Sequence, residues 1–211
     1  MFGAINGALV AYVALPPFIV TLSTFGIAQS LATMLTEGNS ITGLPSYVRW
    51  FNEGHMLGLP IPLWATAVAF AVTYLLLYHT KFGRYTFAIG ANRRALELSG
   101  SNARLFQVLV YVYAGVLTAF ASFIMTARMN AAHPTIGVGL EFDAIAAVIL
   151  GGTSFEKGRG GIVGTLIGAI AVGVLRNGLN LMGVSAEWQV AIVGIIIIAA
   201  VGLDSIRSQN T

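Results

Sequence analysis

IPLWATAVAFAVTYLLLYH at residues 61–79 leads through TKFGRYTFAIGANRRALELSGSNAR at 80–104 into LFQVLVYVYAGVLTAFASFIMTA at 105–127. The outer two stretches carry no charged residue, and each has about the 20 residues that a helix needs to cross a bilayer. The middle segment is basic and opens with polar residues. It holds much of the scarce charge of the chain: Lys81, Arg84, Arg93, Arg94 and Arg104, with Glu97 as its one acid.

The composition points to a bilayer as the solvent of this chain. Only 9% of the 211 residues are charged and 56% are hydrophobic, whereas about a quarter of the residues of a soluble domain are charged. A chain this poor in charge cannot cover its surface with polar groups. The sequence has no cysteine, which excludes disulfides and thiolate metal sites. The basic residues follow membrane topology and form no nucleic-acid patch.

Uncharged runs divide the chain into membrane segments. Pro16-Pro17 separates two of them, because proline breaks a helix, although one broken helix over 1–36 is an alternative. The run at 144–155 is too short to cross and suits a half-helix. We therefore expect an all-α, polytopic transmembrane bundle with short or discontinuous helices. As a single domain over 1–211, it would have spans at 2–15, 18–36, 61–79, 105–127, 143–155, 160–176 and 187–204.

The positive-inside rule orients these spans. It places the basic segment 80–104 in the cytoplasm, and alternation along the chain then places 37–60 and 129–142 outside. The same alternation puts Met1 outside, which suggests that upstream spans are missing or encoded elsewhere. Charges that flank the last short spans, Arg176 and Glu187, are expected either to extend toward the membrane surface or to face protein.

Residues 92–100 have the signals of a short helix beneath the membrane. Asn92 is a good N-cap, because its side-chain oxygen can accept a hydrogen bond from a first-turn amide. Gly100 suits the residue after the helix end, where a left-handed conformation is needed. Arg93 and Glu97 are four apart and can pair. An ordinary amphipathic connector would have the same signals, so this pattern alone does not define a function.

Three separated segments resemble one family. GRYTFAIGANRRALELSGSN at 83–102, PPFIVTLSTFGIAQSLATMLTEG at 16–38 and FDAIAAVILGGTSFEKGRGGIVGTLIGAIAVGVLRNGLNLMGVS at 142–185 are similar to bacterial ABC sugar-uptake permeases of the ribose/xylose/galactose type, a group that includes the autoinducer-2 importers. Family permeases are longer at the N-terminus. The resemblance implies a type II importer fold, and a loop that docks on an ATPase through a coupling helix. By this resemblance, the residues expected to form the coupling helix and its contacts are Gly90, Asn92, Ala95, Leu98, Ser99 and Gly100.

The resemblance also implies the function and partners. We expect a permease subunit in the bacterial inner membrane that translocates a monosaccharide delivered by a periplasmic binding protein. It would pair with a second permease subunit, identical or different. No cofactor is expected on this chain, because a separate ATPase subunit would use the ATP. Gly152 to Lys157 fails the phosphate-loop pattern.

Polar and small residues within the spans have two interpretations each. Thr21, Ser23, Thr24 and Gln29 are candidates for the translocation path, but hydroxyls can also bond their own helix backbone. Gly160, Gly164 and Gly168 recur every fourth residue, a spacing that allows close helix packing in lipid, within the subunit or across a dimer.

Two other function classes remain as alternatives. An intramembrane enzyme would need a base for Ser154, and no histidine follows His133 in the sequence. No two histidines have metal-binding spacing on one helix face, so we expect neither catalytic residues nor a metal. The remaining alternative is a truncated, non-functional or structural permease remnant.

Overall fold

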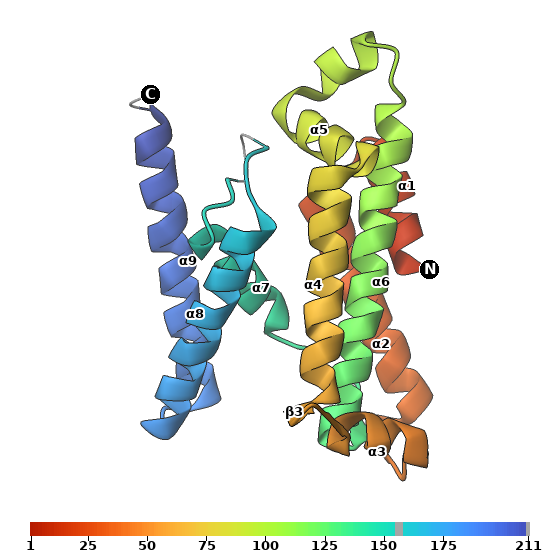
Figure 1. Cartoon of the computed structure of the whole chain (residues 1–211), viewed down its shortest axis with the longest axis vertical. Helices are drawn as coiled ribbons and strands as arrows, with labels where there is room; N and C mark the ends of the chain where they lie inside the picture. Colours follow the sequence, from red (N-terminus) through yellow and green to blue (C-terminus); the bar gives the residue numbers. More distant parts are fainter. Residues whose placement is uncertain (155–157, 210–211) are drawn as a thin grey trace. The chain divides into compact units, whose positions relative to one another are not determined.

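A computed structural model describes residues 1–154 and 158–209, and these residues are almost entirely helical (Figure 1). The expected all-α, polytopic architecture is confirmed. The described residues form two compact units, Met1–Gly137 and Val138–Thr211, and each is described by itself below. The expectation of one transmembrane domain stays a prediction.

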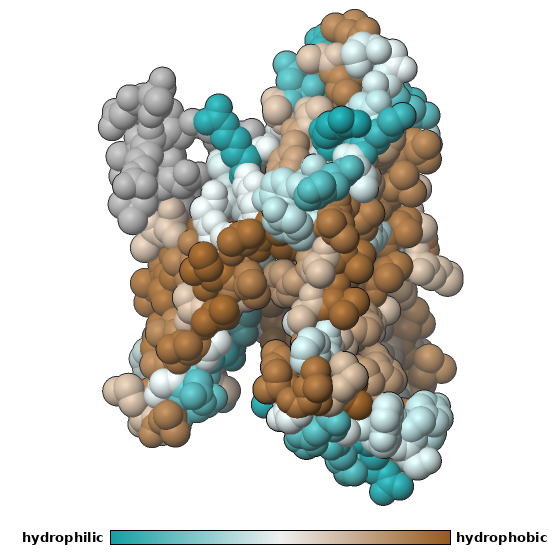
Figure 2. Space-filling view, viewed as in Figure 1, coloured by the Kyte–Doolittle hydropathy of each residue, from teal (hydrophilic) through white to brown (hydrophobic). Residues whose placement is uncertain are grey.

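The first unit contains six helices and four short strands. Its long helices run between a polar end near α5 and a polar end near α3 (Figure 2). The elements are α1 (Phe2–Tyr12), α2 (Pro17–Thr36), β1 (Ile41–Thr42), α3 (Ser46–Glu53), β2 (His55–Met56), β3 (Leu59–Pro60), α4 (Ile61–His79), α5 (Lys81–Leu98), α6 (Ala103–Met129) and β4 (Ala131–Ala132).

Prolines set the beginnings of two helices in this unit. Pro17 occupies the first position of α2 and Pro62 lies in the first turn of α4, where a missing amide costs nothing. Pro16-Pro17 thus separates α1 from α2, as the two-helix interpretation expected. However, α1 has 11 residues, about 16 Å, and is shorter than the predicted span at 2–15.

Glycines bring α1 against α6 at backbone distance. A Cβ added at Gly7 would lie 2.8 Å from Cα of Val108, and one added at Gly3 would meet the carbonyl oxygen of Tyr111. Gly115 of α6 faces Gly3 in return, and a Cβ added at Gly115 would lie 3.2 Å from Cα of Gly3. Gly3 and Gly7 are four residues apart, which is the small-xxx-small spacing of helices that pack closely in lipid.

The end of the unit opposite α5 is more ordered than the sequence predicted. Residues 37–60, which the expected alternation places outside, contain α3, whose Phe51 packs edge-on against Phe123 of α6 with 5.1 Å between ring centroids. A ring contact between residues so far apart in the chain depends on tertiary partners that periodicity does not reveal. Strand β1 pairs with β4, so 37–60 and the segment after α6 lie at one end, as the expected alternation requires.

The second unit is built around the short helix α7 (Leu140–Leu150), together with α8 (Ile162–Leu181) and α9 (Ala186–Gln209). Its buried core consists of Ala146, Ala147, Val172 and Val193. The predicted span 143–155 ends on residues outside the described ranges. The helix predicted at 160–176 begins at Ile162, so Gly160 precedes it and is not on its packing face, contrary to the expected three-glycine stripe.

Close contact between α7 and α8 depends on two glycines of α8. A Cβ on Gly164 would meet the carbonyl oxygen of Gly151, and a Cβ on Gly168 would meet that of Ala147. Ala147 of α7 and Gly151, the residue directly after α7, are themselves four apart. The two helices therefore touch through small residues on both sides, within one unit of the chain.

Four described helices are long and apolar enough to span a membrane: Pro17–Thr36, Ile61–His79, Ala103–Met129 and Ile162–Leu181. Phe2–Tyr12 and Ala186–Ala200 are shorter apolar helices. Large apolar side chains such as Phe18, Leu35 and Ile167 are exposed on these helices, and Figure 2 shows apolar surface over their middles. This surface needs hydrocarbon around it.

We expect Gly168→Ala to destabilise the second unit by about 1–3 kcal/mol, because the new methyl group meets the Ala147 carbonyl and forces α7 and α8 apart. Gly173→Ala on the same helix is the matched control, because a Cβ there has nothing within 4 Å. Unfolding of both variants by SDS in bicelles would measure the difference. Equal stability of the two variants would contradict the packing role.

Candidate functional site

The basic segment forms a helix, α5, that turns sharply away from α4. Thr80 has extended backbone, and its hydroxyl oxygen accepts a hydrogen bond from the amide of Phe82 at 3.2 Å. Gly83 is buried, and a Cβ there would meet the carbonyl oxygen of Leu77. Only glycine lets α5 pass so close to the end of α4, so α5 begins where the membrane span ends.

Asn92 divides α5 into two helices. Its backbone is non-helical (φ −161°, ψ 94°), and its side-chain oxygen accepts a hydrogen bond from the amide of Ala95 at 3.0 Å. Beyond the helix end, Gly100 has φ +79°. Both predicted caps are confirmed, and they delimit a rigid two-turn helix over 93–98, here called the docking helix. Asn102 then caps α6 through the amide of Leu105 at 3.1 Å.

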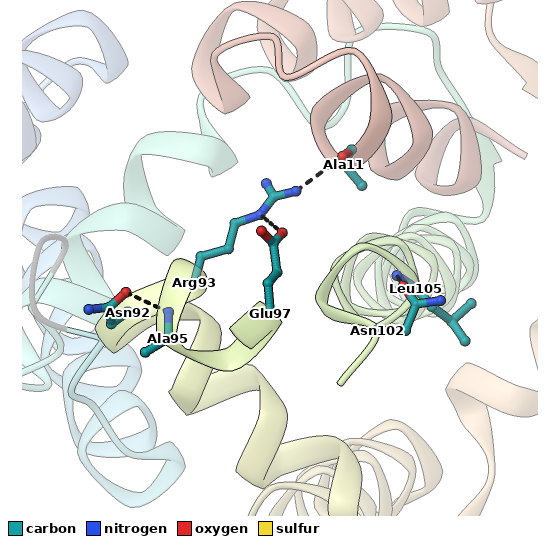
Figure 3. A network of polar contacts seen from close by, with 7 residues as sticks. All are labelled: Ala11, Asn92, Arg93, Ala95, Glu97, Asn102 and Leu105. Atoms are coloured by element: carbon teal, nitrogen blue, oxygen red, sulfur yellow. Dashed lines mark hydrogen bonds and ion pairs between the residues drawn. The ribbon is translucent and has the colours of Figure 1, made fainter. Parts of the chain in front are cut away.

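Arg93 links the docking helix to a distant part of the chain (Figure 3). Its Nε lies 3.0 Å from Oε1 of Glu97, which confirms the expected pair. Its Nη2 donates to the carbonyl oxygen of Ala11, in the last turn of α1, at 3.2 Å. Sequence reasoning missed this bond, because the two residues are 82 positions apart and no local pattern joins them.

The predicted docking residues lie on the exposed side of this segment. Asn92, Ala95, Leu98 and Ser99 are spaced three or four apart and are all exposed, with Leu98 at 84%. Gly90 lies before the kink, on the first half of α5, and is not part of the docking helix. Arg93 and Leu96 are partly buried. The docking helix thus has one free face and one face held by the rest of the unit.

Basic residues around the docking helix remain free of acidic partners. Glu97, the one acid of the segment, is occupied by Arg93. Lys81, Arg84, Arg94 and Arg104 are exposed, and no ion pair to them occurs among the described residues. An uncompensated positive charge at the end of two spans fits a cytoplasmic surface.

The candidate path residues of α2 are partly engaged with their own helix. Thr21 and Thr24 donate their hydroxyls to the carbonyls of Pro17 and Val20, each at 3.0 Å. This is the competing interpretation of these hydroxyls. Ser23 is exposed and Gln29 is partly buried. A role for the four residues in the path stays a prediction.

An ion pair joins α7 to α8 within the second unit. Nε of Arg176 lies 2.7 Å from Oδ2 of Asp143 and donates a hydrogen bond to Oδ1 at 2.9 Å. The sequence left open whether Arg176 extends to the membrane surface or faces protein, and the structure shows the second. The pair lies one helical turn beyond the buried Val172, and Asp143 is in the first turn of α7. Charges inside a membrane protein are costly unless they are paired in this way.

A second polar contact follows one turn further along α8. The Nε2 of Gln189 on α9 donates to Oδ1 of Asn180 at 2.7 Å and to the carbonyl of Val184 at 2.9 Å. Gln189 is only 3% exposed, so these bonds satisfy a buried amide. The stripe on α8 at every fourth residue thus changes from glycine to polar contacts along Gly164, Gly168, Val172, Arg176 and Asn180.

The glycine pair after α7 ends that helix. Gly152 has φ +80°, and the amide of Thr153 donates back to the carbonyl of Val148 at 3.1 Å. This is a glycine helix termination. The segment that was compared with a phosphate loop, Gly152 to Lys157, includes residues 155–157, which are outside the described ranges. Within the described ranges, no three acidic or histidine side chains could hold a metal ion.

Known proteins similar to this chain are permeases. Residues 1–201 match the family described as branched-chain amino acid transport system / permease component. Ribose import permease proteins of Bacillus subtilis (strain 168) and Escherichia coli (strain K12) are 46% and 42% identical over 96% of the chain and 64% of their own lengths. A D-allose transport system permease protein of Escherichia coli (strain K12) is 36% identical over 98% of the chain and 64% of its length. The chain thus spans less than two thirds of these relatives, and no solved structure matches it.

We expect Asp143 and Arg176 to behave as a coupled pair. Asp143→Asn or Arg176→Gln alone should each destabilise the second unit by about 1–3 kcal/mol, because a partly buried charge loses its partner. The double variant should lose less than the sum of the two. Thermal unfolding in nanodiscs of the wild type, the two single variants and the double variant would give the double-mutant cycle. Arg159→Gln, at an exposed position, is the control. Strictly additive effects would contradict an energetic pair.

Proposed function

This chain belongs to the family of branched-chain amino acid transport system permease components, and from that premise we propose that it is the membrane subunit of an ATP-driven sugar importer. Its spans and its family make it a multi-pass protein of the bacterial inner membrane, a transport subunit rather than an enzyme. The resemblance to sugar-uptake permeases is thereby confirmed. Solute, partners and mechanism are the proposed part.

The docking helix is the observation that carries the proposal. It is capped at both ends, stands at the end of two spans, and exposes Asn92, Ala95, Leu98 and Ser99 on one face. A leucine that is 84% exposed on a rigid helix fits a hydrophobic pocket of a partner. In ABC importers that partner is the ATPase subunit, which binds and hydrolyses ATP, so this chain would need no cofactor of its own.

Short connections allow the docking helix to move the spans. Only Thr80 separates α4 from α5, and residues 99–102 lead directly into α6. Both junctions are stiff, because Gly83 presses on Leu77 and Asn102 caps α6. When the partner closes on ATP, a displacement of the docking helix would therefore tilt α4 and α6 instead of being absorbed by a loose loop.

A monosaccharide is the proposed solute. Relatives carry the names ribose, D-allose and fructose permease, whereas the family description names branched-chain amino acids. We favour the sugar because the ribose, D-allose and fructose relatives each match at least 96% of the chain. Hydroxyl-bearing and amide side chains of α2 would line the path. A periplasmic binding protein would deliver the solute, and a second permease subunit, identical or different, would complete the path.

The docking role is tested by co-purification of the chain with the ATPase subunit encoded with it. We expect wild type to retain the ATPase and Leu98→Asp to lose it, because a charge cannot enter an apolar pocket without a partner. Leu57→Asp is the matched control: Leu57 is 85% exposed, in the turn between β2 and β3. Loss of the ATPase from both variants, or from neither, would contradict docking through α5.

The solute is tested by uptake into proteoliposomes that contain the complete transporter and its binding protein. Labelled ribose should accumulate with ATP, unlabelled D-allose should compete, and leucine should not. The expectation rests on hydrogen bonding: a site built to bind the hydroxyl groups of a solute rejects a solute that lacks them by about 10⁴-fold or more. Accumulation of leucine and exclusion of all sugars would replace the sugar proposal with the amino-acid one.

A further inference from the structure

Arg93 points away from the exposed face that Ala95 and Leu98 form on the docking helix. Figure 3 shows its guanidinium extending from α5 toward the end of α1, with Glu97 beside it. The exposed face is formed by Asn92, Ala95 and Leu98, whereas Arg93 is partly buried. One two-turn helix therefore presents one face to solvent and sends a charged contact from the other into the membrane unit.

The contact with Ala11 satisfies a group that α1 cannot satisfy alone. The last carbonyls of a helix have no partner within it and carry the negative end of its dipole. Arg93 Nη2 donates to one of them, at 3.2 Å, and Ala11 is only 2% exposed. Such a charge-assisted bond is stronger than a neutral one, and it ends on a carbonyl of a buried residue.

Glu97 fixes the direction of the guanidinium. Its Oε1 holds Nε of Arg93 at 3.0 Å, so the side chain bonds through Nε on one side and Nη2 on the other. An arginine fork held at two points is far more rigid than a lysine ammonium on its flexible stem. Displacement of the docking helix is thus passed to α1, not lost in side-chain rotation.

From α1 the displacement has a direct continuation into α6. Gly3 and Gly7 bring α1 to backbone contact with α6 at Val108, Tyr111 and Gly115. Helices packed at this distance move together, because packed interiors do not deform continuously. The structure thereby contains a second connection from the docking helix to the spans, besides the chain itself.

We infer that Arg93 is a positioning residue that transmits movement of the docking helix to α1, and that Glu97 orients it. The inference rests on the proposed function, in which an ATPase binds the exposed face. Without Arg93, the ATPase would still bind and hydrolyse ATP, but α1 would no longer follow the docking helix. The result would be hydrolysis without matching transport.

The test compares Arg93→Ala with Arg94→Ala in the reconstituted complete transporter. Arg94 is the adjacent arginine, exposed and without a hydrogen bond to any described residue, so it controls for loss of charge. We expect both variants to retain the ATPase. Arg93→Ala should consume at least about fivefold more ATP per solute transported, because typical coupling between two sites corresponds to factors of about fivefold and above. Arg93→Lys should be intermediate. An unchanged ratio in Arg93→Ala, or loss of ATPase binding together with transport, would overturn the inference.

A second measurement does not depend on the partner. The chain has no cysteine, so Tyr12→Cys and Arg94→Cys accept two spin labels at exposed positions on α1 and the docking helix. In the isolated chain, Arg93→Ala should broaden the distance distribution between the labels, and Glu97→Gln should broaden it less. An unchanged distribution would overturn the link. Failure of wild type to bind an ATPase, with the broadening present, would instead count against the proposed function alone.

Discussion

A hydrocarbon solvent gives helices no hydrophobic reason to associate, and the packing of this chain follows from that constraint. Association must come from close van der Waals contact, which requires backbones without intervening side chains. The chain meets this requirement at Gly3 and Gly7, where α1 meets α6, and at Gly164 and Gly168, where α8 meets α7. In each case the neighbouring helix also offers small residues or bare backbone. Both compact units are therefore built on the same type of contact, although they differ in the number and length of their helices.

Polar contacts supplement this packing at a few positions, mostly near helix ends. Arg93 reaches the last turn of α1, Arg176 reaches the first turn of α7, and Gln189 bridges α9 to Asn180. Each joins groups that would be costly to leave unpaired beside hydrocarbon. Because they are few, each one determines how a particular helix end is held.

The two halves of α5 have different tasks, and Asn92 separates them. The first half follows from α4 and is held by Thr80 and Gly83. The second half is a short capped helix with one free face. A continuous α5 would have kept the free face in line with its first half, whereas the non-helical backbone at Asn92 lets the docking helix take its own direction. A residue chosen for its local capping chemistry thus also sets the geometry of the surface through which we propose the protein is driven.

The sequence by itself determined the membrane environment, the helical class, the bounds of α4 and the caps at Asn92 and Gly100, because these depend on composition and on residues within one or two turns. The pair Arg93–Glu97 belongs with them. Only the tertiary structure decided that Arg93 also bonds Ala11, that Arg176 pairs with Asp143, that residues 46–53 form a helix against α6, and that Gly160 precedes its helix. Those features depend on which helices pack together and on their relative position along the helix axes. The free energy of such packing comes from residues far apart in the chain, so no local sequence pattern predicts it.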